Sequence, residues 1–172
     1  MEKESIGLFV RLPNKIALQF PPRSEEDTSP PHITMLYIGS KTAKETDEIK
    51  SLIETELKQH SVLECEVGGV GYFDTPDGIV AYSKIDCPGL EKIHKALHKV
   101  LTDNNIEVEH IDTKFIPHAT IEYRDDKKYT GKEPSGNFKI DCIELWGDSS
   151  SAKQSWTLEE SWIKRIDKAL HG

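Results

Sequence analysis

Two short segments of this chain repeat one pattern, P-H-x-T-x-x-Y, and nothing around them repeats so closely. A proline favours extended backbone in the residue before it and suits the first position of a strand, so each segment is predicted to open a β-strand. Side chains alternate between the two faces of a strand. His32 and Thr34 therefore share one face, as do His118 and Thr120. Two such pairs facing each other across a cleft would make an acid–base site.

The same alternation places the two tyrosines of the repeat, Tyr37 and Tyr123, on the face opposite the histidines. We expect both rings to pack in the core or to anchor a lobe. A strand that ends or twists early would instead turn either ring toward a ligand, where an aromatic face can stack on a base. Glu122 falls on the face of His118, where it either hydrogen-bonds an imidazole or points to solvent at the strand end. The alternative interpretation of the repeat is that it marks no acid–base site and that two unrelated strands each begin with Pro-His.

The length and composition predict an ordinary globular protein of one domain, or of two small lobes that share a core. Hydrophobic residues make up 36% of the 172 residues, and no apolar run approaches the length of a membrane span. The formal net charge of -8 argues against broad binding to duplex nucleic acid, for which a basic surface is the usual requirement. It leaves room for a small phosphate ligand in a locally positive pocket. We expect a monomer that does not bind membranes.

The cysteines and the N-terminal residues bear on the compartment. Cys65, Cys87 and Cys142 are widely spaced and form no C-x-x-C pair. We therefore expect three reduced thiols that pack as small apolar residues in a reducing compartment. The polar opening MEKES lacks the apolar stretch of a secretory signal. The sequence thus predicts a cytoplasmic protein.

Hydrophobic periodicity and turn residues predict seven strands and two helices in the order β–β–α–β–β–α–β–β–β. The expected strands cover residues 6–12, 31–38, 62–73, 79–85, 115–123, 138–146 and 155–163, and the expected helices cover residues 42–58 and 90–101. Thr42 and Glu45 have the spacing of a capping box at the start of the first helix. This order favours the α+β class, with the helices outside the sheets.

The paired H-x-T segments resemble those of the 2H phosphoesterase superfamily, which includes the RNA 2′,5′-ligase-like proteins, cyclic nucleotide phosphodiesterases and several viral phosphodiesterases. The motifs are His32-Ile33-Thr34 and His118-Ala119-Thr120, and the expected order of elements fits over essentially the full length. The resemblance implies one bilobal α+β domain over residues 1–172, in which two antiparallel-rich sheets line a central cleft with helices outside. It also implies metal-independent phosphodiester chemistry, so no cofactor is expected.

The chemistry expected of such a cleft follows from the side chains. The unperturbed pKa of histidine, about 6.5, suits both proton removal and proton donation near neutral pH. One neutral imidazole would take a proton from a ribose 2′-hydroxyl or a water, and one imidazolium would protonate the leaving oxygen. Thr34 and Thr120 would donate hydrogen bonds to the non-bridging phosphate oxygens. Which of His32 and His118 is the base depends on how the substrate lies.

The substrate is expected to be a small nucleotide or a short RNA end. The reaction would open a 2′,3′-cyclic phosphate, cleave a 2′,5′ linkage, or linearise a cyclic oligonucleotide signal, as in viral relatives that disarm host signalling. Arg11 and Arg124 lie beside the motifs and are candidates to clamp the phosphate. The alternative function is a non-catalytic nucleotide or RNA binder that has kept the cleft, although binding alone does not need two titratable groups.

Three further features are interpreted as structural. His94 and His98 are four residues apart on a predicted helix, but no third metal ligand is evident and lysines surround them, so a solvated helix face is expected. The glycine run at residues 68–71 lacks the order of a phosphate-binding loop and predicts a bulge or bend. The tryptophans are expected to pack in the core or at a lobe edge; they are Trp146, Trp156 and Trp162.

Overall fold

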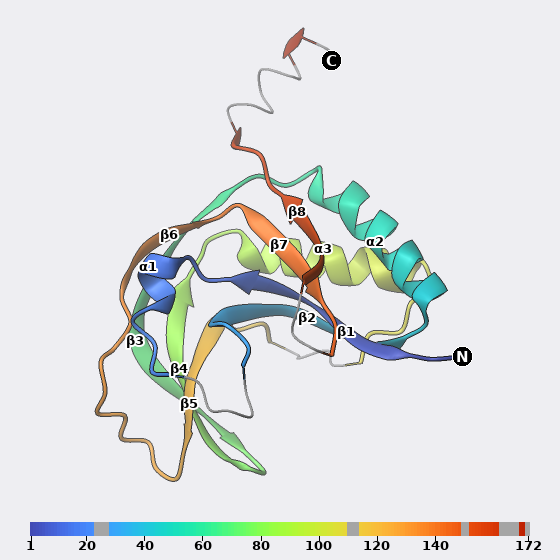
Figure 1. Ribbon diagram of the computed structural model, residues 1–172. Coiled ribbons are helices and arrows are strands. Elements are labelled where there is room, and N and C mark those ends of the chain that lie inside the picture. The colour runs from blue at the N-terminus through green and yellow to red at the C-terminus, as the bar shows by residue number, and fades with distance from the viewer. Residues whose placement is uncertain (23–27, 110–113, 149–151, 162–168, 171–172) are drawn as a thin grey trace.

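The computed structural model describes residues 1–22, 28–109, 114–148, 152–161 and 169–170 (Figure 1). Its elements follow in chain order: β1 (Glu4–Arg11), α1 (Asn14–Ala17), β2 (His32–Lys41), α2 (Ala43–Leu57), β3 (Leu63–Thr75), β4 (Gly78–Asp86), α3 (Leu90–Asp103), β5 (His118–Arg124), β6 (Gly136–Ile140), β7 (Cys142–Trp146) and β8 (Ala152–Thr157). The four-residue helix α1, which begins directly after Pro13, was not predicted from the sequence.

The strands form two four-stranded antiparallel sheets with strand orders β2-β1-β7-β8 and β5-β4-β3-β6. The two strands that carry the repeated motif, β2 and β5, each form an edge of their own sheet. The predicted α+β class is therefore confirmed. The strand orders of the two sheets correspond: in each sheet the motif strand lies at one edge and pairs with the strand that precedes it in the chain, β2 with β1 and β5 with β4.

The predicted single strand over residues 138–146 is wrong, because the chain crosses there from one sheet to the other. β6 pairs with β3, with Phe138 opposite Cys65, whereas β7 pairs with β1, with Leu145 opposite Leu8. The buried positions change phase at Asp141: Phe138 and Ile140 are buried before it, and Ile143 and Leu145 after it. A strand cannot place both sets on one face, so the chain breaks at Asp141 and begins a second strand.

Helices α2 and α3 pack against each other, and they also contact β8 and β2 respectively (Figure 1). Each helix buries one apolar stripe, as the periodicity predicted. The buried residues of these stripes are Ile49, Ile53 and Leu57 in α2, and Leu90, Ile93, Leu97 and Leu101 in α3. The predicted capping box is confirmed, since the Thr42 hydroxyl accepts from the Glu45 amide and the Glu45 carboxylate accepts from the Thr42 amide.

The cysteine prediction is wrong for two of the three thiols. Cys65 in β3 and Cys87 just after β4 form a disulfide, with their Cα atoms 4.4 Å apart. The pairing of β3 with β4 places Glu66 opposite Asp86 and so brings the two cysteines together. Sequence spacing could not show this, because the register of the two strands decides it. Cys142 is a free thiol, and burial raises its pKa.

The last strand, β8, begins three residues earlier than predicted and ends at Thr157. The end of the predicted strand, residues 162–163, lies outside the described residues, as does Trp162. Trp146 and Trp156 are buried, as expected, at 3% and 7% exposure. Within the described part of the chain, no helix combines the length and apolar character needed to cross a membrane.

Candidate active site

The two motif strands lie side by side, although they belong to different sheets. Residues of β2 and β5 approach to within 8 Å between Cα atoms (Figure 1). His32 is the first residue of β2, and His118 is the first residue of β5. The fold therefore juxtaposes the strands that carry the two imidazole–hydroxyl pairs. All four motif side chains are half-buried.

Each motif histidine is held by the same backbone contact. Nδ1 of His32 lies 2.7 Å from the carbonyl oxygen of Pro30, and Nδ1 of His118 lies 2.8 Å from the carbonyl oxygen of Ile116. A carbonyl oxygen can only accept a hydrogen bond, so Nδ1 carries the proton in both rings. Nε2 is then the nitrogen that gains or loses a proton. Both imidazoles are thus oriented in one way by the residue two positions before them.

His32 contacts a stacked pair of aromatic rings from the neighbouring strands. Phe9 of β1 and Trp146 of β7 stack with their centroids 4.5 Å apart. The His32 ring meets both of them edge-on, at 5.3 Å from Phe9 and 5.1 Å from Trp146. Phe9 lies opposite Thr34 in the β1–β2 register. The imidazole is therefore confined by two large side chains in addition to its hydrogen bond.

His118 has the corresponding arrangement in the other sheet. Phe73 of β3 and Tyr82 of β4 stack with their centroids 4.2 Å apart. The His118 ring meets them edge-on at 4.9 Å and 5.3 Å. Tyr82 lies opposite Thr120, as Phe9 lies opposite the threonine of the first motif. The two halves of the molecule thus build the same surroundings for each histidine from unlike sequences.

A β-bulge follows each motif and changes the faces of the residues after it. In β2, Leu8 lies opposite Leu36 while Phe9 lies opposite Thr34, so Met35 is the extra residue. In β5 the extra residue is Ile121. A bulge inserts one residue and so moves the following side chains to the other face of the strand.

The bulges overturn the prediction that both tyrosines face the core. Tyr37 is 48% exposed, and its ring meets Phe9 edge-on at 5.8 Å. Tyr123 is 68% exposed and lies opposite Val80, on the face that carries His118. Both tyrosines lie on the histidine side of their sheets, because the bulge moves each of them to the other face of its strand. The prediction failed because it continued the alternation of faces through a bulge that the sequence could not reveal.

The bulge in β5 also corrects the placement of Glu122. This residue lies opposite the buried Ala81, not on the face of His118. Its carboxylate accepts a hydrogen bond from Arg124 at 2.6 Å, and Arg124 also pairs with Asp126. The hydrogen bond from Arg124 to Glu122, and then that to Asp126, raise the pKa of Arg124. The charge of Arg124 is therefore shared between two carboxylates at the end of the strand.

Arg11 lies opposite His32 in the register of β1 and β2. Its guanidinium pairs with Glu144 at 3.1 Å and lies over the Trp146 ring, 5.6 Å from the centroid. This cation is thus close to the first histidine and its aromatic pair. The adjacent carboxylate neutralises part of its charge.

A hollow of about 260 Å³ opens beside His32. Tyr37, Trp146 and Asp148 are among the residues that line it. One carboxylate oxygen of Asp148 accepts from the Ser5 amide at 3.3 Å. The hollow combines aromatic surface with polar groups at its rim, next to a motif histidine.

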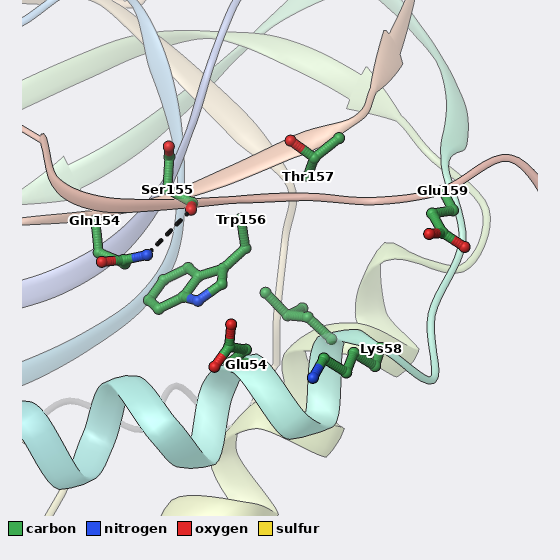
Figure 2. A pocket seen from close by; sticks show the side chains of 8 residues that line it. Glu54, Lys58, Gln154, Ser155, Trp156, Thr157 and Glu159 are labelled. Atoms are coloured by element: carbon green, nitrogen blue, oxygen red, sulfur yellow. Dashed lines mark hydrogen bonds between the residues drawn. The ribbon is translucent and has the colours of Figure 1, made fainter.

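A larger hollow of about 630 Å³ lies between α2 and β8, and none of the motif residues lines it (Figure 2). Trp156 of β8 and Glu54 of α2 face each other across it, with Lys58 at the end of the helix. Because both motif histidines lie elsewhere, size alone does not mark this hollow as the active site. Among the residues with described positions, no group of three His, Cys, Asp or Glu side chains could hold a metal ion.

Sequence reasoning missed the two aromatic pairs that enclose the histidines. The turn sequence at residues 74–78 does join the strands of Phe73 and Tyr82, but nothing local shows that these strands lie beside the strand of the second motif. For the first pair, the available signal was the position of Phe9 two residues before Arg11, which places both on the same face of the first strand. The pairing of that strand with the motif strand was still needed to bring Phe9 to His32.

Gly71 is predicted to be essential for the surroundings of His118. It lies opposite Tyr82, and a Cβ atom at this position would overlap the Tyr82 ring. Gly71→Ala should therefore displace a ring that contacts His118 and should destabilise the fold by about 1–3 kcal/mol. Denaturant unfolding and turnover measure the two effects.

The matched control is Gly68→Ala in the same strand, since a Cβ atom there meets nothing within 4 Å. The register shift between Val67 and Val70 confirms the predicted bulge in this glycine run. Equal stability and equal turnover of the two alanine variants would contradict the role assigned to Gly71.

Comparison with known proteins identifies both the sequence family and the fold. Residues 15–146 match the family described as the 2'-5' RNA ligase superfamily. The crystal structure of E. coli LigT complexed with 3'-AMP has a TM-score of 0.71 and 16% sequence identity, with 91% of this chain and 99% of that chain covered. TT0787 of Thermus thermophilus has a TM-score of 0.71 at 14% identity, over 91% and 99% of the two chains. The PDE domain of MHV ns2 has a TM-score of 0.56 at 12% identity, over 83% and 99%.

Proposed function

Since this chain belongs to the 2'-5' RNA ligase superfamily, in agreement with the 2H phosphoesterase resemblance of its motifs, we propose that it is a metal-independent phosphodiesterase acting on a nucleotide. One observation carries the proposal: two neighbouring edge strands each begin with a histidine whose Nδ1 donates to the carbonyl two residues earlier. A binding site needs no such pair of equally oriented imidazoles. Displacement at phosphorus by general acid–base catalysis uses one group that takes a proton and one that gives a proton, and two imidazoles that both present Nε2 can fill these roles.

In the proposed reaction, Nε2 of one neutral imidazole removes a proton from the attacking 2′-hydroxyl or water. Nε2 of the other, protonated imidazole gives a proton to the oxygen that leaves phosphorus. Thr34 and Thr120, two residues beyond the histidines, donate hydrogen bonds to the non-bridging oxygens as negative charge builds on them. The carbonyls of Pro30 and Ile116 keep the Nδ1 protons in place through both steps.

The hollow beside His32 is the proposed nucleoside site, with Tyr37 as the ring that contacts the base. Tyr123, exposed on the histidine face of the other sheet, would contact the substrate on the His118 side. Arg11 is the proposed phosphate or ribose contact near His32. Arg124 and Glu122 form an ion pair with each other. We therefore propose that they contact the substrate only at the outer end of β5.

The proposed substrates are small nucleotide phosphodiesters: a 2′,3′-cyclic phosphate, a 2′,5′-linked oligonucleotide, or a cyclic oligonucleotide. The structures of LigT complexed with 3'-AMP, NADP+ and ATP support a nucleotide as the ligand class. The monomeric state stays a prediction. So does the cytoplasmic location, and the Cys65–Cys87 disulfide is more typical of an oxidising compartment.

The proposal predicts that EDTA leaves turnover unchanged, because imidazoles and hydroxyls supply all the proposed chemistry. The purified protein is incubated with the three substrate classes, with and without chelator, and the products are separated by chromatography. Loss of turnover in EDTA would show that a metal takes part. Binding of nucleotides without turnover of any phosphodiester would favour the non-catalytic binder instead.

A further inference from the structure

His94 of helix α3 contacts the segments of both H-x-T motifs, and the proposed function gives it no role. We propose that His94 is a positioning residue that holds the two motif strands in their catalytic arrangement. The proposal rests on the proposed function, because it assigns His94 to the same site. It replaces the sequence-based expectation of a solvated helix face, which is wrong for His94, since this side chain is half-buried and makes two specific contacts.

The first contact is with the strand of the first motif. Nδ1 of His94 donates to the carbonyl oxygen of Met35 at 2.7 Å. Met35 directly follows Thr34 and is the extra residue of the bulge. A bulged residue lies outside the regular ladder of hydrogen bonds, and β2 is an edge strand, so the carbonyl is satisfied by a side chain from a different element. The helix therefore fixes β2 one residue beyond a proposed catalytic hydroxyl.

The second contact is with the segment that leads into the second motif. The His94 ring stacks on Phe115 with the centroids 4.2 Å apart and the planes 5° from parallel. Phe115 precedes Ile116, whose carbonyl accepts from Nδ1 of His118. A displacement of the Phe115 ring would move the adjacent peptide and with it the acceptor that orients His118.

The helix that carries His94 is itself rigidly packed. Ile93 and Leu97 on either side are 2% and 0% exposed. The side chain thus bridges β2 and the entry to β5 from a fixed point, with its donor directed to one motif and its ring to the other. His98, one turn further along, does not share these contacts, and its buried Nε2 has no hydrogen-bond partner among the described residues.

The two contacts can be removed separately. His94→Asn keeps an N–H donor close to the position of Nδ1 and removes the ring from Phe115. His94→Phe keeps the stacked ring and removes the donor to Met35. Each variant is expected to lower kcat about tenfold with KM changed less than about twofold, and His94→Ala about a hundredfold, because a small misplacement of catalytic groups slows chemistry more than binding.

His98→Phe is the matched control, with the same substitution one turn away on the same helix, and it is expected to keep the wild-type kcat. Thermal unfolding is measured for each variant, so that a loss of folded protein is not mistaken for a lower kcat. Wild-type kcat and KM in folded His94→Phe and His94→Asn would overturn the proposal. So would an equal loss of kcat in His98→Phe.

The imidazole signals of His32 and His118 in long-range ¹H–¹⁵N NMR spectra provide a readout that needs no substrate. They are expected to shift in His94→Phe and His94→Asn and to stay in place in His98→Phe. Unchanged signals would overturn the positioning role even if the wild type turned over no phosphodiester. Absence of turnover with shifted signals would instead count against the proposed function alone.

Discussion

His32→Ala and His118→Ala are each expected to lower kcat/KM by about 10²–10⁴-fold, because each removes one proton-transfer group from the transition state. The kcat/KM of the double variant should be only slightly lower than that of the less active single variant, since residues that act as a unit have non-additive effects. Steady-state kinetics on the preferred phosphodiester measures these losses. The wild type should show a bell-shaped pH–rate profile, with one histidine required neutral and the other protonated.

His60→Ala is the control for this prediction. His60 pairs with Glu56 at 3.3 Å at the end of α2 and takes no part in the proposed site. The His60 variant is expected to keep the wild-type rate. A wild-type rate in His32→Ala or in His118→Ala would contradict acid–base catalysis by these two histidines.

The same variants can assign the base and the acid, which the geometry leaves symmetrical. A substrate with a p-nitrophenolate leaving group needs no protonation of the leaving oxygen. The variant that lacks the acid should therefore recover most of its rate on this substrate, and the variant that lacks the base should not. Equal recovery of both would contradict separate roles for His32 and His118.

Thr34→Val and Thr120→Val are expected to lower kcat by about 10²–10³-fold each, because each removes one hydrogen-bond donor from the developing charge on phosphate. Valine keeps the branched shape and suits a β-strand, so the fold should tolerate the change. KM should change less than kcat, since the donors are strongest in the transition state. Initial rates over a range of substrate concentrations up to saturation separate the two constants.

Thr157→Val in β8 is the control, because it makes the same substitution at an exposed strand position away from the motifs. Each motif threonine lies opposite an aromatic ring that contacts the neighbouring histidine, Phe9 for Thr34 and Tyr82 for Thr120. Histidine NMR signals that shift in the valine variants would therefore indicate a disturbed ring pair, whereas a loss of kcat with unshifted signals supports a direct role of the hydroxyls.

Local patterns predicted much of this structure. The helical spacing of apolar residues predicted α2 and α3, and the capping pair Thr42 and Glu45 marked the beginning of α2. The strand predicted over residues 31–38 began within one residue of β2, whereas the strand predicted over residues 115–123 began three residues before β5. The repeated motif indicated that the two strands act together. These features depend on residues within a few positions of one another, where sequence spacing translates directly into geometry.

The sequence alone determined which side chains carry the proposed chemistry, His32, Thr34, His118 and Thr120, and the kind of strand that presents them. Only the tertiary structure decided what surrounds them: the bulges that move Tyr37 and Tyr123 to the histidine face of their sheets, the aromatic pairs that contact the imidazoles, and the contacts of His94. The tertiary structure also decided the Cys65–Cys87 bond. The physical reason is that strand register and helix docking join residues far apart in the chain. Their energies depend on packing across elements, which the periodicity of a single element does not contain.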